Sequence, residues 1–177
     1  HISKSVYVKF AIKNKNTSAL NAKRVKKPIF LIIWTTTPWT LPANKAVSIN
    51  KDFKYGIYEV NQECWIVEKN LSEKISEKIG KKLSLVSEID GVDLLSLRYI
   101  SPISNTESPV VYADYVTKES GTGLVHTAPG HGTDDYSTGI KNNLEVFSPV
   151  DHAGRFTEEA GSELSGLNVL SDGNEKV

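Results

Sequence analysis

Two short segments hold the side chains best suited to chemistry. The first, Trp34 to Asn44, reads WTTTPWTLPAN, and its three consecutive threonines end at Pro38. A strand that stops at a proline turn leaves N–H groups and hydroxyls without ladder partners. Such an array could hold an ester, an adenosine or an attacking water. Threonine also favours strands, so a purely structural role stays open.

The second segment, Gly121 to Tyr136, reads GTGLVHTAPGHGTDDY. It predicts a strand up to His126, then a loop rich in proline and glycine, then a helix. Glycines let backbone approach a ligand closely. Asp134 and Asp135 fall in the first helical turn, where the helix dipole favours ionised carboxylates. An ionised aspartate suits the binding of an ammonium group, although both residues, Asp134 above all, could simply complement the dipole.

The histidines of this segment have plainer alternatives too. His126 could be a packed core histidine and His131 a solvated loop residue. Together with the two aspartates they could form a loose metal site, but their spacing matches no standard zinc motif. The chain has no Gly-x-Ser-x-Gly elbow, and its single cysteine, Cys64, is remote in sequence from both histidines. A covalent nucleophile is therefore not indicated; if the chain is a hydrolase, we expect water to attack the substrate directly, with no metal and no cofactor.

Short strands dominate the elements that must position these segments. The patterns predict strands at 6–12, 29–33, 55–60, 64–67, 109–115 and 124–127, with further short strands in 84–97. The run 29–33 is typical of a strand buried on both faces. Pro38 and Pro42 are expected to prevent any regular element until about Ala46. Many strands with few helices predict an α+β fold, a β-barrel core with a few peripheral helices.

Two helices are expected. Leu71, Ile75 and Ile79 recur every four residues, with Asn70 as the expected cap and Gly80 as the terminator. A second helix is expected over 134–143, weakened by its internal glycine. The tail from residue 148 carries turn signals with little regular pattern.

Composition limits the function classes. The chain has 177 residues, 39% of them hydrophobic, which is enough for one core and one domain. Lysine plus arginine equals aspartate plus glutamate at 21 each, so contact with nucleic acid must be local. The basic cluster Lys23–Lys27 could touch phosphate or form a solvated loop.

The longest apolar run, Ile29–Trp34, is too short to span a bilayer. The absence of methionine suggests a fragment of a larger chain.

Both segments closely resemble the signatures of the editing domain (connective peptide 1) that is inserted in isoleucyl-tRNA synthetases of bacterial and organellar type. A third stretch, Ser148 to Asp151 followed by Gly154 to Thr157, is similar to the exit region of that family. The resemblance extends from about Ser5 to Val169. The valyl and leucyl enzymes carry arginine where this chain has Thr37, which favours the isoleucyl type.

The resemblance implies hydrolytic removal of valine wrongly attached to the isoleucine tRNA. Thr36, Thr37 and Asn44 would position the ester and the water, and Asp135 would hold the free α-amino group. His126 would limit the side-chain pocket so that isoleucine clashes. The residues implied in substrate binding are Trp34, Thr35, Trp39 and His131.

The resemblance also implies how the domain is organised and what it meets. The whole chain, 1–177, would be one editing domain, with residues 1–12 and about 165–177 leading to and from a missing catalytic domain. Its partner would be the 3′ end of tRNA(Ile) carrying valine, with valyl-adenylate as a second candidate substrate. The fragment would be monomeric, away from membranes, in the cytoplasm or an organelle. The alternative is a non-catalytic module that binds aminoacyl-tRNA ends or aminoacyl-adenylate.

Overall fold

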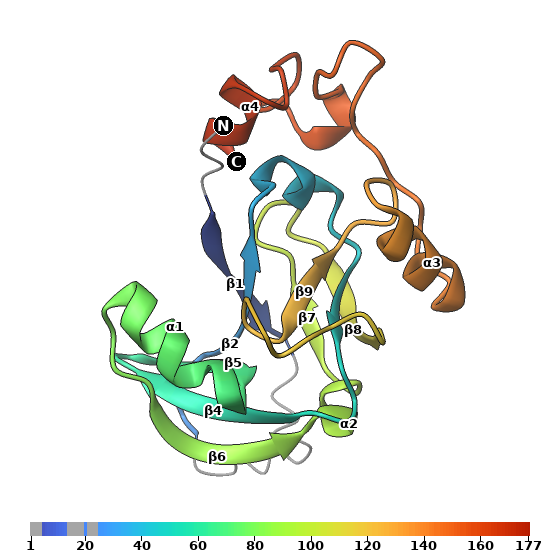
Figure 1. The fold of residues 1–177 in the computed structure, drawn as a ribbon. Helices are drawn as coiled ribbons and strands as arrows, with labels where there is room; N and C mark the ends of the chain where they lie inside the picture. The colour runs from blue at the N-terminus through green and yellow to red at the C-terminus, as the bar shows by residue number, and fades with distance from the viewer. Residues whose placement is uncertain (1–4, 14–19, 21–24) are drawn as a thin grey trace.

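Nine strands form one mixed sheet in the computed structural model, which describes residues 5–13, 20 and 25–177 (Figure 1). The hydrogen-bonded order is β6-β4-β5-β2-β1-β7-β8-β3-β9. The strands are β1 (Val6–Ile12), β2 (Ile29–Thr35), β3 (Ala46–Ile49), β4 (Lys54–Val60), β5 (Glu63–Glu68), β6 (Ser84–Asp90), β7 (Arg98–Ile100), β8 (Glu107–Tyr112) and β9 (Leu124–Thr127). The pairs β2–β5 and β3–β8 are parallel, and the other pairs are antiparallel.

Short helical segments lie around this sheet. The α-helices are α1 (Ser72–Ile79), α2 (Gly91–Leu94), α3 (Thr133–Lys141) and α4 (Asp172–Lys176), and the 3₁₀ turns are η1 (Pro38–Ala43), η2 (Lys69–Leu71) and η3 (Glu158–Ala160). None of the helices in the described ranges could span a membrane.

Strand β2 is covered on both faces, as its unbroken apolar run predicts. Leu31 and Ile33 belong to the main core, whereas Ile32 belongs to a second apolar cluster with Ile75 of α1. Successive strand side chains point to opposite faces, so one strand serves both clusters. Figure 1 shows α1 over the part of the sheet made by β4 and β5.

The predicted α+β fold with a barrel-like core is confirmed, in a partly open form. The sheet curls so that its last strand, β9, packs against β2, although β9 is an end strand of the hydrogen-bonded order. Leu31 and Leu124, one from each strand, share the main core. The curl therefore brings the two segments that carry the candidate chemistry side by side.

Strand positions agree well with the sequence patterns. Strands β1 and β9 have the predicted bounds, β2 continues two residues further than predicted, and β4 and β5 form the expected hairpin. In the stretch 84–97, β6 is followed by the short helix α2. The tail holds only η3 and α4 as helical turns. The polar loop expected from Lys13 to Lys27 lies mostly outside the described residues.

Two local expectations are wrong. Pro38 and Pro42 do not exclude regular structure, because η1 forms with Pro38 at its first positions. A proline there lacks only an N–H that would have no helical partner. Asn70 does not cap α1: its own N–H donates to Glu68 Oε2 over 2.8 Å, and it lies in η2. The predicted terminator holds, since Gly80 follows α1 in a left-handed conformation.

Both described ends of the chain lie at the η1 end of the molecule (Figure 1). Val6 pairs with Thr35, the last residue of β2. Helix α4 packs against η1, where the Trp39 N–H donates to Asn174 Oδ1 over 3.1 Å. The C-terminal turn therefore supports the segment that follows β2.

Gly123 sets the start of β9 by its close approach to β5. It has φ +74°, and a Cβ placed there would lie 2.2 Å from Glu68 Cβ. Its carbonyl accepts a hydrogen bond from the Tyr55 hydroxyl over 2.7 Å. Any side chain at this position would push β9 away from β5.

Gly123→Ala is expected to destabilise the protein more than Gly154→Ala. Gly154 has nearly the same φ, +72°, but no atom within 4 Å of its virtual Cβ. Both variants carry the left-handed strain of about 1–2 kcal/mol, and only Gly123→Ala adds a clash of about 1–3 kcal/mol. Urea unfolding of the two variants measures the difference. Equal losses would contradict the close packing of β9 on β5.

Candidate functional site

The first candidate segment turns sharply where β2 ends. Thr35 is the last strand residue, and its Oγ1 accepts a hydrogen bond from the Thr37 N–H over 3.1 Å. The chain then enters η1, where the Thr40 hydroxyl donates to the Thr37 carbonyl over 2.9 Å. The hydroxyls of Thr35, Thr37 and Thr40 therefore gather within one tight turn, whereas the motif predicted Thr35, Thr36 and Thr37.

The second segment connects β9 to α3. His126 lies opposite Val47 in the antiparallel β3–β9 pair. After β9 the chain turns at Ala128 and begins α3 at Thr133, with Gly132 as the residue before it. Gly139 does not simply weaken α3: a Cβ there would lie 2.8 Å from two atoms of the Pro129 side chain, so the glycine lets helix and loop meet.

Asp135 points back from the first turn of α3 toward the end of β9. Its Oδ2 accepts from the Ala128 N–H over 2.8 Å, and its Oδ1 accepts from the Tyr115 hydroxyl over 3.3 Å. Burial raises the pKa of Asp135, although these two donors act in the opposite direction. This corrects the expectation from the helix dipole alone. Asp134, the residue before Asp135 in the same helix, is exposed.

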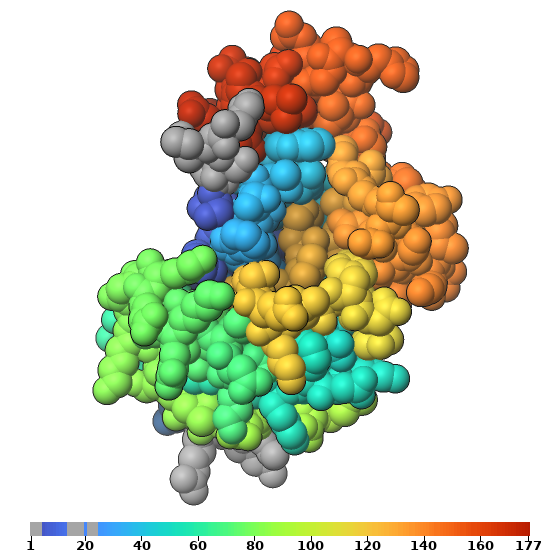
Figure 2. Space-filling view, in the orientation of Figure 1, coloured from blue at the N-terminus to red at the C-terminus, as the bar shows by residue number. Residues whose placement is uncertain are grey.

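The two segments line one cavity of about 230 Å³. Figure 2 shows the surface hollowed between the residues of β2 and η1 and those of β9 and α3. The lining residues are Trp34, Thr35, Thr37, Thr40, Val125, His126, His131 and Asp135. The threonine turn and the aspartate-bearing helix start, far apart in sequence, therefore face a common space.

Three of the predicted site residues do not line this cavity. Thr36 is exposed, beside the lining residues Thr35 and Thr37. Asn44 is 2% exposed and lies behind His126. Trp39 is half-buried, and its ring meets the His131 ring edge-on, with 5.1 Å between the centroids.

Sequence reasoning missed Thr40 and Val125 in the lining and Tyr115 behind it. Thr40 stands three residues after Thr37, the spacing of one 3₁₀ turn, which could have indicated it. Tyr115 had no such signal, because only the fold brings it to Asp135.

His126 is held at both ring nitrogens. Asn44 Nδ2 lies 2.8 Å from Nδ1, and Thr40 Oγ1 lies 3.0 Å from Nε2. With both nitrogens occupied by protein groups, the carbon atoms of the ring remain to face the cavity. Burial lowers the pKa of His126 to about 4, so the imidazole is neutral near pH 7.

His131 also lines the cavity, but its hydrogen bonding differs from that of His126. Among the described residues, no group makes a hydrogen bond to its buried Nε2. Burial also lowers the pKa of His131. This nitrogen is therefore buried without a protein partner in the described part of the chain.

Among the described residues, no group of three histidine, cysteine, aspartate or glutamate side chains gathers closely enough to hold a metal ion. Cys64 is buried in β5 and does not line the cavity. The chemistry available in the cavity is therefore that of hydroxyls, a carboxylate and imidazoles.

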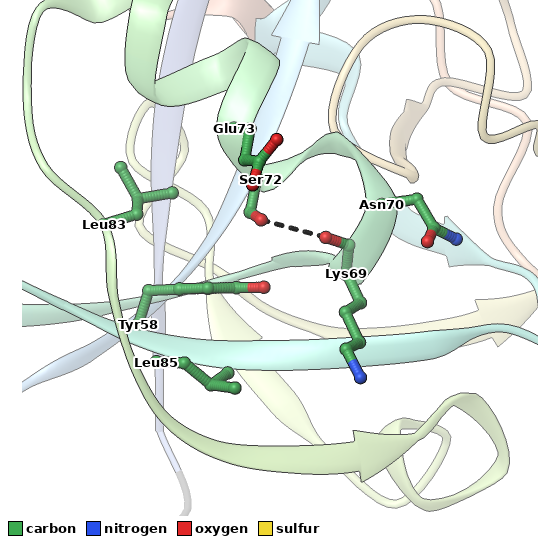
Figure 3. A pocket seen from close by; sticks show the side chains of 7 residues that line it. All are labelled: Tyr58, Lys69, Asn70, Ser72, Glu73, Leu83 and Leu85. Atoms are coloured by element: carbon green, nitrogen blue, oxygen red, sulfur yellow. Dashed lines mark hydrogen bonds between the residues drawn. The ribbon is translucent and has the colours of Figure 1, made fainter.

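A larger cavity of about 470 Å³ lies between α1 and the strands β4 and β6 (Figure 3). Three of its polar residues already have protein partners. The Ser72 hydroxyl donates to the Lys69 carbonyl over 2.9 Å, Lys69 pairs with Glu88 over 2.5 Å, and Asn70 Nδ2 donates to Glu68 Oε1 over 2.9 Å. No histidine lines it. The smaller cavity is therefore the better candidate site.

Of the basic cluster Lys23–Lys27, Lys23 and Arg24 lie outside the described residues. Lys27 is described, and it pairs with Glu59 over 2.8 Å and donates to the Asn61 carbonyl over 2.9 Å. These contacts favour a structural role for Lys27 over a phosphate contact.

Comparison with known proteins shows which family this chain belongs to. The model of the family described as leucyl-tRNA synthetase, editing domain, matches residues 3–172. An isoleucine–tRNA ligase of Nostoc punctiforme is 44% identical over the whole chain, and the chloroplastic/mitochondrial isoleucine–tRNA ligase of Arabidopsis thaliana is 43% identical over the whole chain. The chain spans 19% and 18% of these two relatives, so it is similar to one part of each.

Solved structures agree at the level of the fold. The crystal structure of GlLeuRS-CP1 matches with TM-score 0.67 and 20% identity, over 81% of this chain and 66% of that one. The P. knowlesi cytosolic leucyl-tRNA synthetase editing domain matches with TM-score 0.66 and 15% identity, over 77% of this chain and 62% of that one. The resemblance seen in the two motifs is confirmed.

The buried neutral state of His126 predicts a loss of stability in mild acid. Its folded-state pKa lies below the ordinary 6.5, so the unfolded chain takes up the proton first as the pH falls. Stability from this group is therefore complete above about pH 6.5 and is lost toward pH 4, by about 2 kcal/mol between pH 7 and pH 5.

Urea unfolding at both pH values should show this extra loss in the wild type relative to His126→Gln, which has no imidazole to titrate. The comparison with the variant removes the contributions of His131 and the carboxylates. Equal losses in the two proteins would show that His126 is not held neutral.

Proposed function

The chain belongs to the leucyl-tRNA synthetase editing-domain family, and from this premise we propose that it hydrolyses valine from wrongly charged isoleucine tRNA. The isoleucyl assignment is supported by relatives at 43–44% identity, against 15–20% for the leucyl domains of known structure. Thr37 supports it too, because leucyl and valyl enzymes carry arginine at that position.

The observation that carries the proposal is the shared cavity. Asp135 stands in the same lining as Thr35, Thr37 and Thr40, in a space of about 230 Å³. A carboxylate suits an α-ammonium group, and hydroxyls suit an ester and a water molecule. One aminoacyl ester needs all of these groups together.

Asp135 is the group we assign to the α-amino end of the substrate. Each of its carboxylate oxygens already accepts one hydrogen bond, from Ala128 or from Tyr115, and keeps a lone pair for another donor. The two protein donors fix the direction of the carboxylate. Binding of the ammonium group would also favour the ionised carboxylate against the effect of burial.

The threonine turn is the group we assign to the ester and the water. Thr37 faces the cavity, and Thr36 lies beside it on the exposed surface. We assign the entrance that receives the terminal adenosine to Trp34, Thr35 and Trp39. The first two line the cavity, and Trp39 packs against His131. Asn44 does not contact the substrate in this proposal; it holds His126, which lines the cavity.

Water attacks the ester carbonyl directly in this proposal. The Thr40 hydroxyl does meet an imidazole, His126 Nε2, but its own proton goes to the Thr37 carbonyl, so Nε2 donates to Thr40 and cannot take its proton as the base of a covalent nucleophile would. The ester bond to the ribose breaks, and free valine and tRNA leave. His131 Nε2, without a protein partner, is assigned to the substrate or its water.

Selection against isoleucine follows from the wall that His126 forms. Valine and isoleucine differ by one methylene, which a hydrophobic pocket discriminates by only ~1–3 kcal/mol; isoleucyl-tRNA synthetases are themselves the standard example of this limit. A second, smaller site must therefore destroy the error and refuse the cognate product. The ring carbons of His126 supply a rigid apolar surface where the extra methylene would clash.

The proposed partner is the 3′ end of tRNA(Ile) carrying valine, with valyl-adenylate as a second substrate. The chain acts in this proposal as a domain, 1–177, inserted in a larger synthetase, entered through residues 1–12 and left through about 165–177. Its share of 18–19% of the relatives, and the common end at which its described termini lie, support this organisation. We propose the cytoplasm as its location, with an organelle as the alternative, since one relative is chloroplastic or mitochondrial.

Asp135→Ala is expected to lower the rate of valyl-tRNA(Ile) hydrolysis at least a hundredfold, because the ammonium group loses its only carboxylate in the lining (about 2.7 kcal/mol or more, from charge-assisted binding and positioning). Asp134→Ala is the matched control, one residue away on the same helical turn and exposed, and it should keep the wild-type rate. Single-turnover deacylation with the protein in excess measures both.

Unchanged hydrolysis by Asp135→Ala would defeat the assignment of this site. A wild-type chain that binds valyl-tRNA(Ile) but never releases valine would instead be a non-catalytic binding module.

A further inference from the structure

Tyr99 in β7 reaches the site without lining the cavity. Its side chain is fully buried, and its hydroxyl donates to Asn44 Oδ1 over 2.5 Å. The ring packs edge-on against Phe10, with 5.1 Å between the centroids. Its neighbours therefore hold both the ring and the hydroxyl of Tyr99.

The Asn44 amide can satisfy its neighbours in one orientation only. On one side Nδ2 donates to the Ala46 carbonyl over 3.0 Å and faces His126 Nδ1 at 2.8 Å. On the other side Oδ1 accepts from Tyr99. A reversed amide would place Oδ1 against the Ala46 carbonyl, two acceptors facing each other, and the Tyr99 hydroxyl would face Nδ2, to which it cannot donate.

The orientation of the amide fixes the tautomer of His126. Because Nδ2 can only donate, Nδ1 must accept, and the neutral ring carries its proton on Nε2. That N–H donates to Thr40 Oγ1, 3.0 Å away, and the Thr40 hydroxyl donates in turn to the Thr37 carbonyl. The donors all run in one direction, from Tyr99 to the threonine turn.

We propose that Tyr99 is a positioning residue for the choice between valyl and isoleucyl esters. It holds the Asn44 amide, which holds the His126 ring in one tautomer and one orientation as a wall of the cavity. A ring with two fixed nitrogens cannot rock away from a substrate, so it can exclude a single methylene. This role rests on the proposed hydrolysis of valyl-tRNA, and it places a determinant of selectivity in β7, outside both signature motifs.

The test compares Tyr99→Phe with Tyr55→Phe. Both tyrosines are fully buried, and both variants lose one hydroxyl that donates a buried hydrogen bond; Tyr55 donates to the Gly123 carbonyl and not to Asn44. We expect Tyr99→Phe to lower the ratio of valyl to isoleucyl hydrolysis by about threefold to tenfold, the loss of one net hydrogen bond. The isoleucyl rate should rise while the valyl rate changes little. Tyr55→Phe should keep the wild-type ratio.

Nitrogen NMR of ¹⁵N-histidine-labelled protein measures the tautomer of His126 directly, without any substrate. The wild type and Tyr55→Phe should show His126 with the proton on Nε2 alone, and Tyr99→Phe should show Nδ1 shifted toward an average of both tautomers. An unchanged hydrolysis ratio in Tyr99→Phe, or a wild-type His126 protonated at Nδ1, would overturn the proposal. If the wild type hydrolyses neither ester, the proposed function fails, whereas the resonances still decide whether Tyr99 positions the ring.

Discussion

The site depends on the hydrogen bond between the Asn44 amide and the His126 imidazole. It joins the end of η1 to β9, two segments separated by 82 residues, over 2.8 Å in a buried environment. An unpaired polar group at this depth would be costly, so each partner fixes the other. The result is an imidazole that is neutral, bonded at both nitrogens and turned with its carbon atoms toward the cavity. His126 is thus better suited to form a fixed wall of the cavity than to transfer a proton.

The rest of the fold keeps this bond in place. Gly123 lets β9 begin against β5, and Gly139 lets α3 approach Pro129, so that Asp135 returns to the end of β9. The curl of the sheet brings β9 against β2, and α4 packs against η1. The contacts at Gly123 and Gly139 are close because a side chain is missing, and α4 is held to η1 by a hydrogen bond from the Trp39 backbone N–H. Together they set the distance between the threonine turn and the carboxylate.

The sequence predicted local elements well where apolar runs end at strong turn residues. Strand β9 is bounded by Gly123 and Pro129, and both of its ends were predicted correctly. The 3₁₀ turn at Pro38 was missed, because proline disfavours helix interiors but fits a first turn. The cap at Asn70 was wrong because Glu68, two residues earlier, accepts from both the backbone N–H and the side-chain amide of Asn70 and so caps η2, in which Asn70 lies. The pKa of Asp135 followed burial and not the dipole, and burial is a property of the folded chain. Tyr99 could not be found from sequence, since it meets Asn44 across 55 residues without a motif.

The most direct measurement is the single-turnover hydrolysis of valyl- and isoleucyl-tRNA(Ile) by the wild type and by His126→Ala. If the His126 ring is the wall that excludes the cognate amino acid, the wild type hydrolyses the valyl ester at least about tenfold faster. Removing the ring then opens the cavity, and His126→Ala hydrolyses both esters at similar rates. A His126→Ala protein that keeps the wild-type preference for valine would show that the selection lies elsewhere.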